Sequence, residues 1–213
     1  MRHLSHAIAV TALVAVPAAA AAEDAGGCGS NDPEVRMTAC TAVIDAADTA
    51  PAQRAEAFFR RGLSWSQFNQ YQRAIHDYDE TLRITPADAA ALNNRAYSWL
   101  KLGKLQQALP DAEEALKIAP ESAVFMSTRG EILQALGDRE GAIRDHEAAM
   151  WFGGKVVVKG YQCSLKLARL YDGPVDGFVR PEVTTALGLC VEQGDKCAPV
   201  PSFLGTECLE PVG

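Results

Sequence analysis

Six cysteines are the side chains of this sequence with the most readily interpreted chemistry. Two of them lie near the N-terminal end, four lie beyond residue 162, and none falls between these two groups. An even number of cysteines in an exported protein indicates disulfide bonds rather than free thiols. We predict that Cys28 bonds to Cys40 and that the other four pair among themselves. Their spacing leaves the pairing open, with Cys163–Cys190 and Cys197–Cys208 as the favoured arrangement.

Metal binding and catalysis have much weaker candidates. The cysteines form no C-x-x-C pair, and His76 and His146 are the only histidines after residue 22. Both histidines fall at positions that we expect to be exposed on helices. Asp172 and Asp176 supply too few oxygen ligands for a calcium loop. The sequence also lacks the nucleophile, phosphate-loop and metalloprotease motifs. We therefore predict a protein that is not an enzyme and holds no metal or cofactor.

The first 22 residues predict the compartment. A short positive start leads into an apolar run, Ala7–Val16, and an alanine tract, 18–22, precedes the acidic Glu23. This order is typical of a secretory signal peptide with an Ala-x-Ala site, and we predict cleavage after Ala22. An apolar run of about ten residues is too short to anchor the chain across a bilayer. The acidic residues after it argue against lipidation of Cys28. We expect a periplasmic protein, with full secretion left open.

The composition favours a folded, helical chain. Of 213 residues, 48% are hydrophobic and 22% are charged, which is enough apolar side chain for a core and excludes compositional disorder. Alanine is frequent and favours helix. The formal net charge is -7, without a block of lysine or arginine, so nucleic acid and anionic lipid are poor partner candidates.

A spacing of 34 residues organises the middle of the chain. Small residues, arginines, alanines, aspartates and prolines all recur at this offset, which predicts three units over 55–88, 89–122 and 123–156. The recurring sets are Gly62, Ala96 and Gly130; Arg61, Arg95 and Arg129; Ala74, Ala108 and Ala142; Asp77, Asp111 and Asp145; Pro86 and Pro120. Their spacing resembles the tetratricopeptide repeat.

The resemblance implies an all-α fold. Each unit would be two antiparallel helices joined by a turn, and the stacked units would form a right-handed solenoid with a concave face. We expect the small residue of each first helix to face the alanine of the second, and each arginine to form an ion pair with the aspartate sixteen residues later. Residues 23–54 would add a disulfide-stapled helix, and residues 157–213 a small helical cap.

The concave face is the expected binding site. In the family, ligand contacts come mainly from the first helices, and a mixed amide and aromatic lining suits an extended peptide. The carboxylate-clamping version of this groove is matched only at Asn94, because Phe59, Val124 and Thr128 replace its cations. A solvated groove without a specific ligand is the alternative. The expected groove residues are Phe59, Leu63, Asn93, Asn94, Tyr97, Lys101, Glu131 and Gln134.

The C-terminal segment resembles a different family. The residues that carry the resemblance are Gln162, Leu165, Tyr171, Gly173, Pro174, Asp176, Gly177, Pro181, Ala186 and Leu187. Their order is similar to that of the small helical peptidoglycan-binding domain of bacterial wall enzymes, with Arg180 in place of a family glycine. This resemblance implies peptidoglycan contacts from Tyr171 and Asp176. Two functions follow: a periplasmic scaffold that binds a protein or peptide in its groove, or a wall-associated adaptor whose C-terminal segment binds peptidoglycan.

Overall fold

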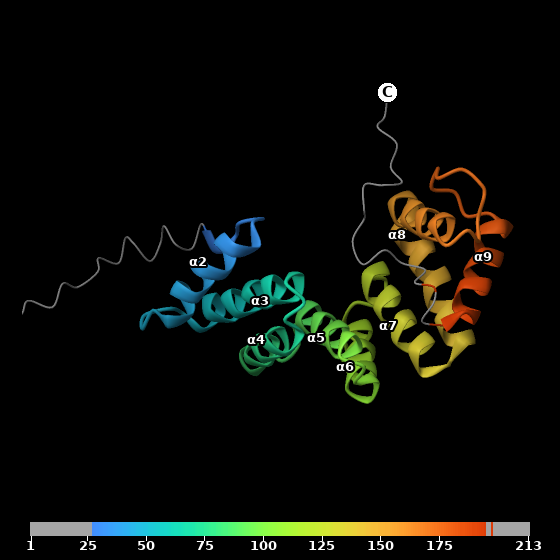
Figure 1. Cartoon of the computed structure of the whole chain (residues 1–213). Coiled ribbons are helices and arrows are strands. Elements are labelled where there is room, and N and C mark those ends of the chain that lie inside the picture. Colours follow the sequence, from blue (N-terminus) through green and yellow to red (C-terminus); the bar gives the residue numbers. More distant parts are fainter. Residues whose placement is uncertain (1–26, 195–196, 198–213) are drawn as a thin grey trace, which may run out of the picture.

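The structure is a computed structural model that describes residues 27–194 and 197, and these residues contain helices and no strands. The predicted signal peptide and Cys208 lie outside the described residues. Consecutive helices pack side by side in a row from the N-terminal to the C-terminal end (Figure 1). The all-α expectation is confirmed. The helices are α2 (Pro33–Asp45), α3 (Pro51–Gln67), α4 (Tyr71–Ile84), α5 (Ala89–Lys101), α6 (Leu105–Ile118), α7 (Ala123–Leu136), α8 (Arg139–Leu167) and α9 (Pro181–Glu192).

The turns between paired helices recur at the same spacing. Gly103 and Gly137 follow α5 and α7 and have φ angles of 70° and 87°. Asn69 occupies the equivalent place after α3 and has a φ of 57°. Glycine adopts this left-handed conformation without steric cost, and asparagine is among the few other residues that tolerate it. The helices therefore pair as α3 with α4, α5 with α6 and α7 with the first part of α8.

Close approach in the first and third pairs involves different partners from those expected, whereas Ala96 and Ala108 of the second pair share one buried cluster. A Cβ atom added at Gly62 would lie 2.6 Å from the ring of Tyr78, and one added at Gly130 would lie 2.7 Å from the ring of His146. The nearest side chains are therefore these rings and not the alanines. His146 is fully buried, so the expectation that it is exposed is wrong, whereas His76 is exposed as expected.

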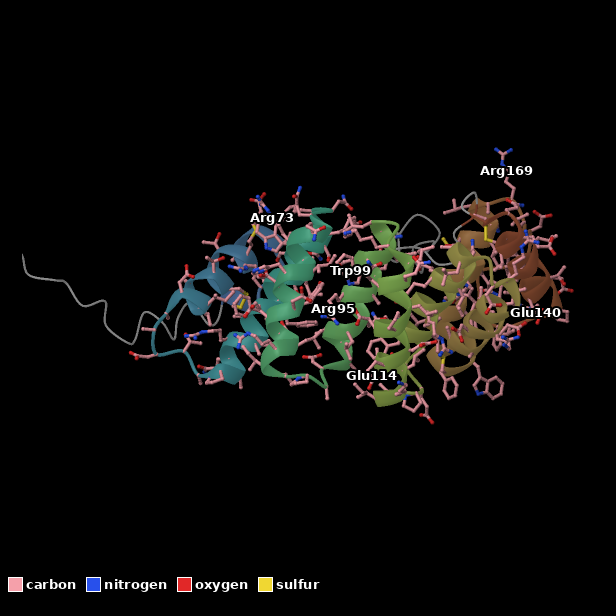
Figure 2. The ribbon with its side chains drawn as sticks, turned by 90° about the horizontal axis from the view of Figure 1, so that it is seen from below. Arg73, Arg95, Trp99, Glu114, Glu140 and Arg169 are labelled. Carbon is pink, nitrogen blue, oxygen red and sulfur yellow. A yellow bond between two sulfur atoms is a disulfide. The ribbon has the colours of Figure 1, made fainter. Side chains whose placement is uncertain are left out.

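The predicted arginine–aspartate pairs are confirmed in all three units. Arg61 donates two hydrogen bonds of 2.8 Å to Asp77. The corresponding pairs, Arg95 with Asp111 and Arg129 with Asp145, have both bonds at 2.7 Å. Figure 2 shows Arg95 within the row of helices. Two-pronged bonds of this kind fix the orientation of one helix against the next.

The N-terminal end is held by the predicted Cys28–Cys40 disulfide. Cys40 is fully buried in a cluster that includes Ala57 of α3, so α2 packs against the first repeat. Cys28 and Cys40 lie 34 residues before Gly62 and Ala74. The disulfide thus occupies the sequence positions at which the later units have small residues.

The C-terminal end departs from the predicted pairing. Cys190 of α9 is bonded to Cys197, so neither Cys163–Cys190 nor Cys197–Cys208 is correct. Cys163 is also disulfide-bonded. The helix α8 is interrupted by the non-helical Gly154, which has a φ of 61°, and its second part packs with α9. Within the described residues, no helix is long and apolar enough to cross a membrane.

Candidate functional site

A groove of about 1050 Å³ runs along the first helices of the repeats. Helices α3, α5 and α7 line it, α2 adds Arg36 at one end, and the second part of α8 closes the other end. Six of the eight residues expected on the concave face line this groove. They are Leu63, Asn93, Asn94, Tyr97, Lys101 and Glu131.

The structure places the other two expected residues elsewhere. Phe59 packs against Tyr78, with ring centroids 6.1 Å apart, and contributes to the contact between the first two repeats. Gln134 donates hydrogen bonds of 2.9 Å to the carbonyl oxygens of Gly194 and Cys197. This side chain therefore ties the end of α9 to α7 instead of facing the groove.

Lys101, in the last turn of α5, and Glu131 of α7 form a charged pair in the groove. The Lys101 ammonium is 3.6 Å from a Glu131 carboxylate oxygen and 4.7 Å from the centre of the Tyr97 ring. The rings of Tyr71 and Tyr97 make an edge contact, with their centroids 6.4 Å apart. Burial raises the pKa of Glu131, with partial opposition from Lys101. Burial lowers the pKa of Lys101, but Glu131 and Tyr97 outweigh it and leave that pKa above its usual value.

Arg36 is a groove residue that the sequence analysis missed. Its Nε donates to Ser64 at 2.9 Å, and its two terminal nitrogens donate to the Ser30 carbonyl oxygen and the Gln67 side chain. Burial lowers its pKa, and the nearby Arg60 adds to this effect. Each of the three nitrogens donates one hydrogen bond within the chain, and these bonds hold the guanidinium in place at one end of the groove. The sequence signal was an arginine within an otherwise mostly apolar helix face.

Two neighbouring asparagines of α5 have different surroundings. Asn94 donates from Nδ2 to the Ala90 carbonyl oxygen at 2.8 Å, which is a contact within its own helix. Asn93 is 4% exposed, and its Oδ1 atom has no hydrogen-bond partner within the described residues. A buried polar oxygen without a partner is costly, so Asn93 is the lining residue with the strongest unmet demand for a hydrogen-bond donor.

A buried hydrogen-bonded chain lies behind the far end of the groove. The Tyr161 hydroxyl is 3.1 Å from Ser127 Oγ and 2.9 Å from His146 Nδ1. Burial lowers the pKa of His146 to about 4, so the imidazole is neutral at neutral pH. The sequence analysis missed this chain, although Ser127 and Tyr161 are separated by the repeat length.

Comparison with known proteins identifies the repeats. The family model described as "Tetratricopeptide repeat" matches residues 89–122, which contain α5 and α6. Residues 89–122 match one tetratricopeptide repeat, and the neighbouring units repeat its helix pair at the same spacing.

Two solved structures share the tetratricopeptide-repeat fold of this chain. MamA from Desulfovibrio magneticus RS-1, from residue 41 to its end, aligns with a TM-score of 0.57 and 19% identity over 71% of this chain and 83% of MamA. The ArsTM double mutant of MamA RS-1 aligns with a TM-score of 0.58 and 18% identity, over 82% and 94% of the two chains. At these identities the likeness is one of fold.

The residues expected to contact peptidoglycan lie beyond the tetratricopeptide repeats and make internal bonds. Tyr171 is 4% exposed, and its hydroxyl donates to the Pro174 carbonyl oxygen at 3.0 Å. The Asp176 carboxylate accepts bonds of 2.6 and 2.8 Å from Arg180, which hold its pKa well below the usual range. Gln162 also donates to Asp176 at 3.2 Å. In the described residues no cluster of metal-ligating side chains adds a second site.

Proposed function

We propose that this chain is a non-catalytic, exported interaction scaffold whose groove binds an extended segment of a partner protein. The observation that carries the proposal is the groove itself, about 1050 Å³ in volume and containing the unpartnered Asn93 oxygen. This volume is at the upper end of the range found for ligand-binding pockets, about 300–1,000 Å³. The tetratricopeptide repeat supports a role in protein–protein interaction.

The lining favours a peptide over other ligands. Amide side chains can pair with both the N–H and the C=O groups of a backbone, and Asn93 and Asn94 line the groove. An extended chain offers such groups at every residue. The hydroxyl groups of Ser127 and Thr128 also line it, but they donate to carbonyl oxygens of their own helix. The nearly fully buried disulfides Cys28–Cys40 and Cys190–Cys197 support export, because such bonds persist in oxidising compartments.

Site-specific photo-crosslinking in cells tests this proposal. A photoreactive amino acid at Tyr97, inside the groove, should crosslink to a partner protein in the periplasmic fraction. The matched position is Glu114 on α6, a surface residue outside the groove (Figure 2). The crosslink from position 97 should be lost when Asn94→Ala is added, with little change in melting temperature. Equal crosslinking from both positions, or none from position 97, would contradict the proposal.

A further inference from the structure

The two long edges of the groove differ in whether their polar side chains already have partners within the chain. The first helices α5 and α7 run side by side, so residues in their early turns share one edge and residues in their late turns share the other. The ion pair between Lys101 and Glu131 joins the late turns. We call this the charged edge, consisting of Tyr71, Tyr97, Lys101 and Glu131. The open edge consists of Asn93, Ala123, Val124, Val156 and Val157.

The charged edge is held together by contacts among its own side chains. Lys101 has Glu131 as its counter-ion and the Tyr97 ring beneath it, and Tyr71 covers Tyr97 from the side. A charged ligand group at this edge competes with the Lys101–Glu131 ion pair. The charges also cancel, so this edge gives little attraction to a strongly charged ligand.

The open edge has unmet demands of two kinds. Asn93 is only 4% exposed, and its Oδ1 atom has no hydrogen-bond donor within the described residues. Val124 and Val156 also line the groove, yet they are 63% and 64% exposed. Val124 begins α7, and Val156 follows the Gly154 break that turns the second part of α8 towards the groove. The Asn93 side chain makes no hydrogen bond within the described residues, so none has to break when the amide turns towards a ligand.

We infer that the partner's segment docks along the open edge: a backbone N–H donates to Asn93, and an apolar side chain is buried between Val124 and Val156. This inference rests on the proposed function. Neighbouring helix axes lie about 10 Å apart. An extended chain covers that distance in about three residues. The apolar residue should therefore lie about three positions from the N–H that Asn93 receives. The segment should be uncharged at both positions, because neither contact offers a counter-ion.

The test uses a defined peptide as the probe. Twelve-residue peptides are selected from a displayed random library against the oxidised protein lacking residues 1–22, and the best one is synthesised and titrated by calorimetry. Val124→Asp should weaken its binding at least tenfold. Val35→Asp is the matched control, because Val35 is also an exposed valine in the first turn of a helix, but outside the groove. This control should leave the affinity unchanged.

The hydrogen bond to Asn93 is tested by removing each partner in turn. Methylation of one backbone nitrogen of the peptide should weaken binding to the unmodified protein at least tenfold. The same methylation should have little further effect in Asn93→Leu, because the acceptor is already absent. Leucine has nearly the shape of asparagine and suits a buried position, so this variant should fold.

The outcomes separate the inference from the proposed function. If the peptide binds Val124→Asp and Asn93→Leu normally but fails to bind Lys101→Met, the inference is overturned and the groove remains the binding site. If substitutions on both edges leave binding unchanged, or if no peptide is selected, both the inference and the proposed function are overturned.

Discussion

Gly62→Ala is expected to destabilise the protein, although it replaces glycine by the best helix former. Within α3 the substitution gains about 1 kcal/mol in helix propensity. The added Cβ would lie 2.6 Å from the Tyr78 ring, which is fully buried and cannot move aside cheaply. Overpacking costs roughly 1–3 kcal/mol, and so short a contact belongs at the upper end. We expect a net loss of about 2 kcal/mol in the free energy of unfolding, which is about 4–8 °C in melting temperature.

Equilibrium unfolding in urea measures this effect against two controls. Gly188 lies within α9 and has no atom within 4 Å of its Cβ position, so Gly188→Ala should stabilise the protein by up to about 1 kcal/mol. In a Tyr78→Ala background, Gly62→Ala recreates the alanine pair that Ala96 and Ala112 form in the second repeat, and it should no longer destabilise. A stabilising Gly62→Ala, or an equal loss in both backgrounds, would refute the argument.

Three further outcomes can be measured in the same way. Burial lowers the pKa of His146 to about 4 in the folded state, so the unfolded state takes up a proton first as the pH falls. The free energy of unfolding should therefore fall by about 3 kcal/mol between about pH 6.5 and pH 4. His146→Gln should lose this part of the pH profile, and an unchanged profile would contradict the assignment. Arg95→Met leaves the mostly buried Asp111 without its cation and should cost about 3 kcal/mol, whereas Arg83→Met, at an exposed ion pair, should cost less than about 1 kcal/mol. Replacing Cys28 and Cys40 by serine should cost about 2–3 kcal/mol; a double variant that unfolds at the wild-type urea concentration would show that the bond adds no stability.

The repeat could be predicted from the sequence because its physical constraints recur. A pair such as Arg95 and Asp111 appears in every unit at the same separation, so its geometry follows from one helix hairpin. The turn at Asn69 is left-handed like those at Gly103 and Gly137, but asparagine replaces glycine there, so the residue types do not recur although the conformation does.

The remaining features depend on contacts that periodicity does not describe. His146 is buried because Gly130 leaves room for its ring, a relation between residues sixteen apart that differs from the alanine register. Gln134 has a groove position in the sequence, but the end of α9 lies close enough to take its hydrogen bonds. The Cys190–Cys197 bond depends on how the chain turns after α9, which spacing alone does not determine.

The positions of the disulfides also bear on how the stack of repeats comes apart. Each repeat contacts mainly its neighbours, so such an array behaves as a one-dimensional lattice in which the terminal units, with a neighbour on one side only, melt first. Here the Cys28–Cys40 disulfide lies before the first repeat and the Cys190–Cys197 disulfide lies beyond the last one. The three repeats between them, 55–156, contain no cysteine. Fraying is therefore opposed at both ends where it would begin. Under oxidising conditions the array should unfold as one cooperative block, and after reduction it should shorten stepwise from its ends.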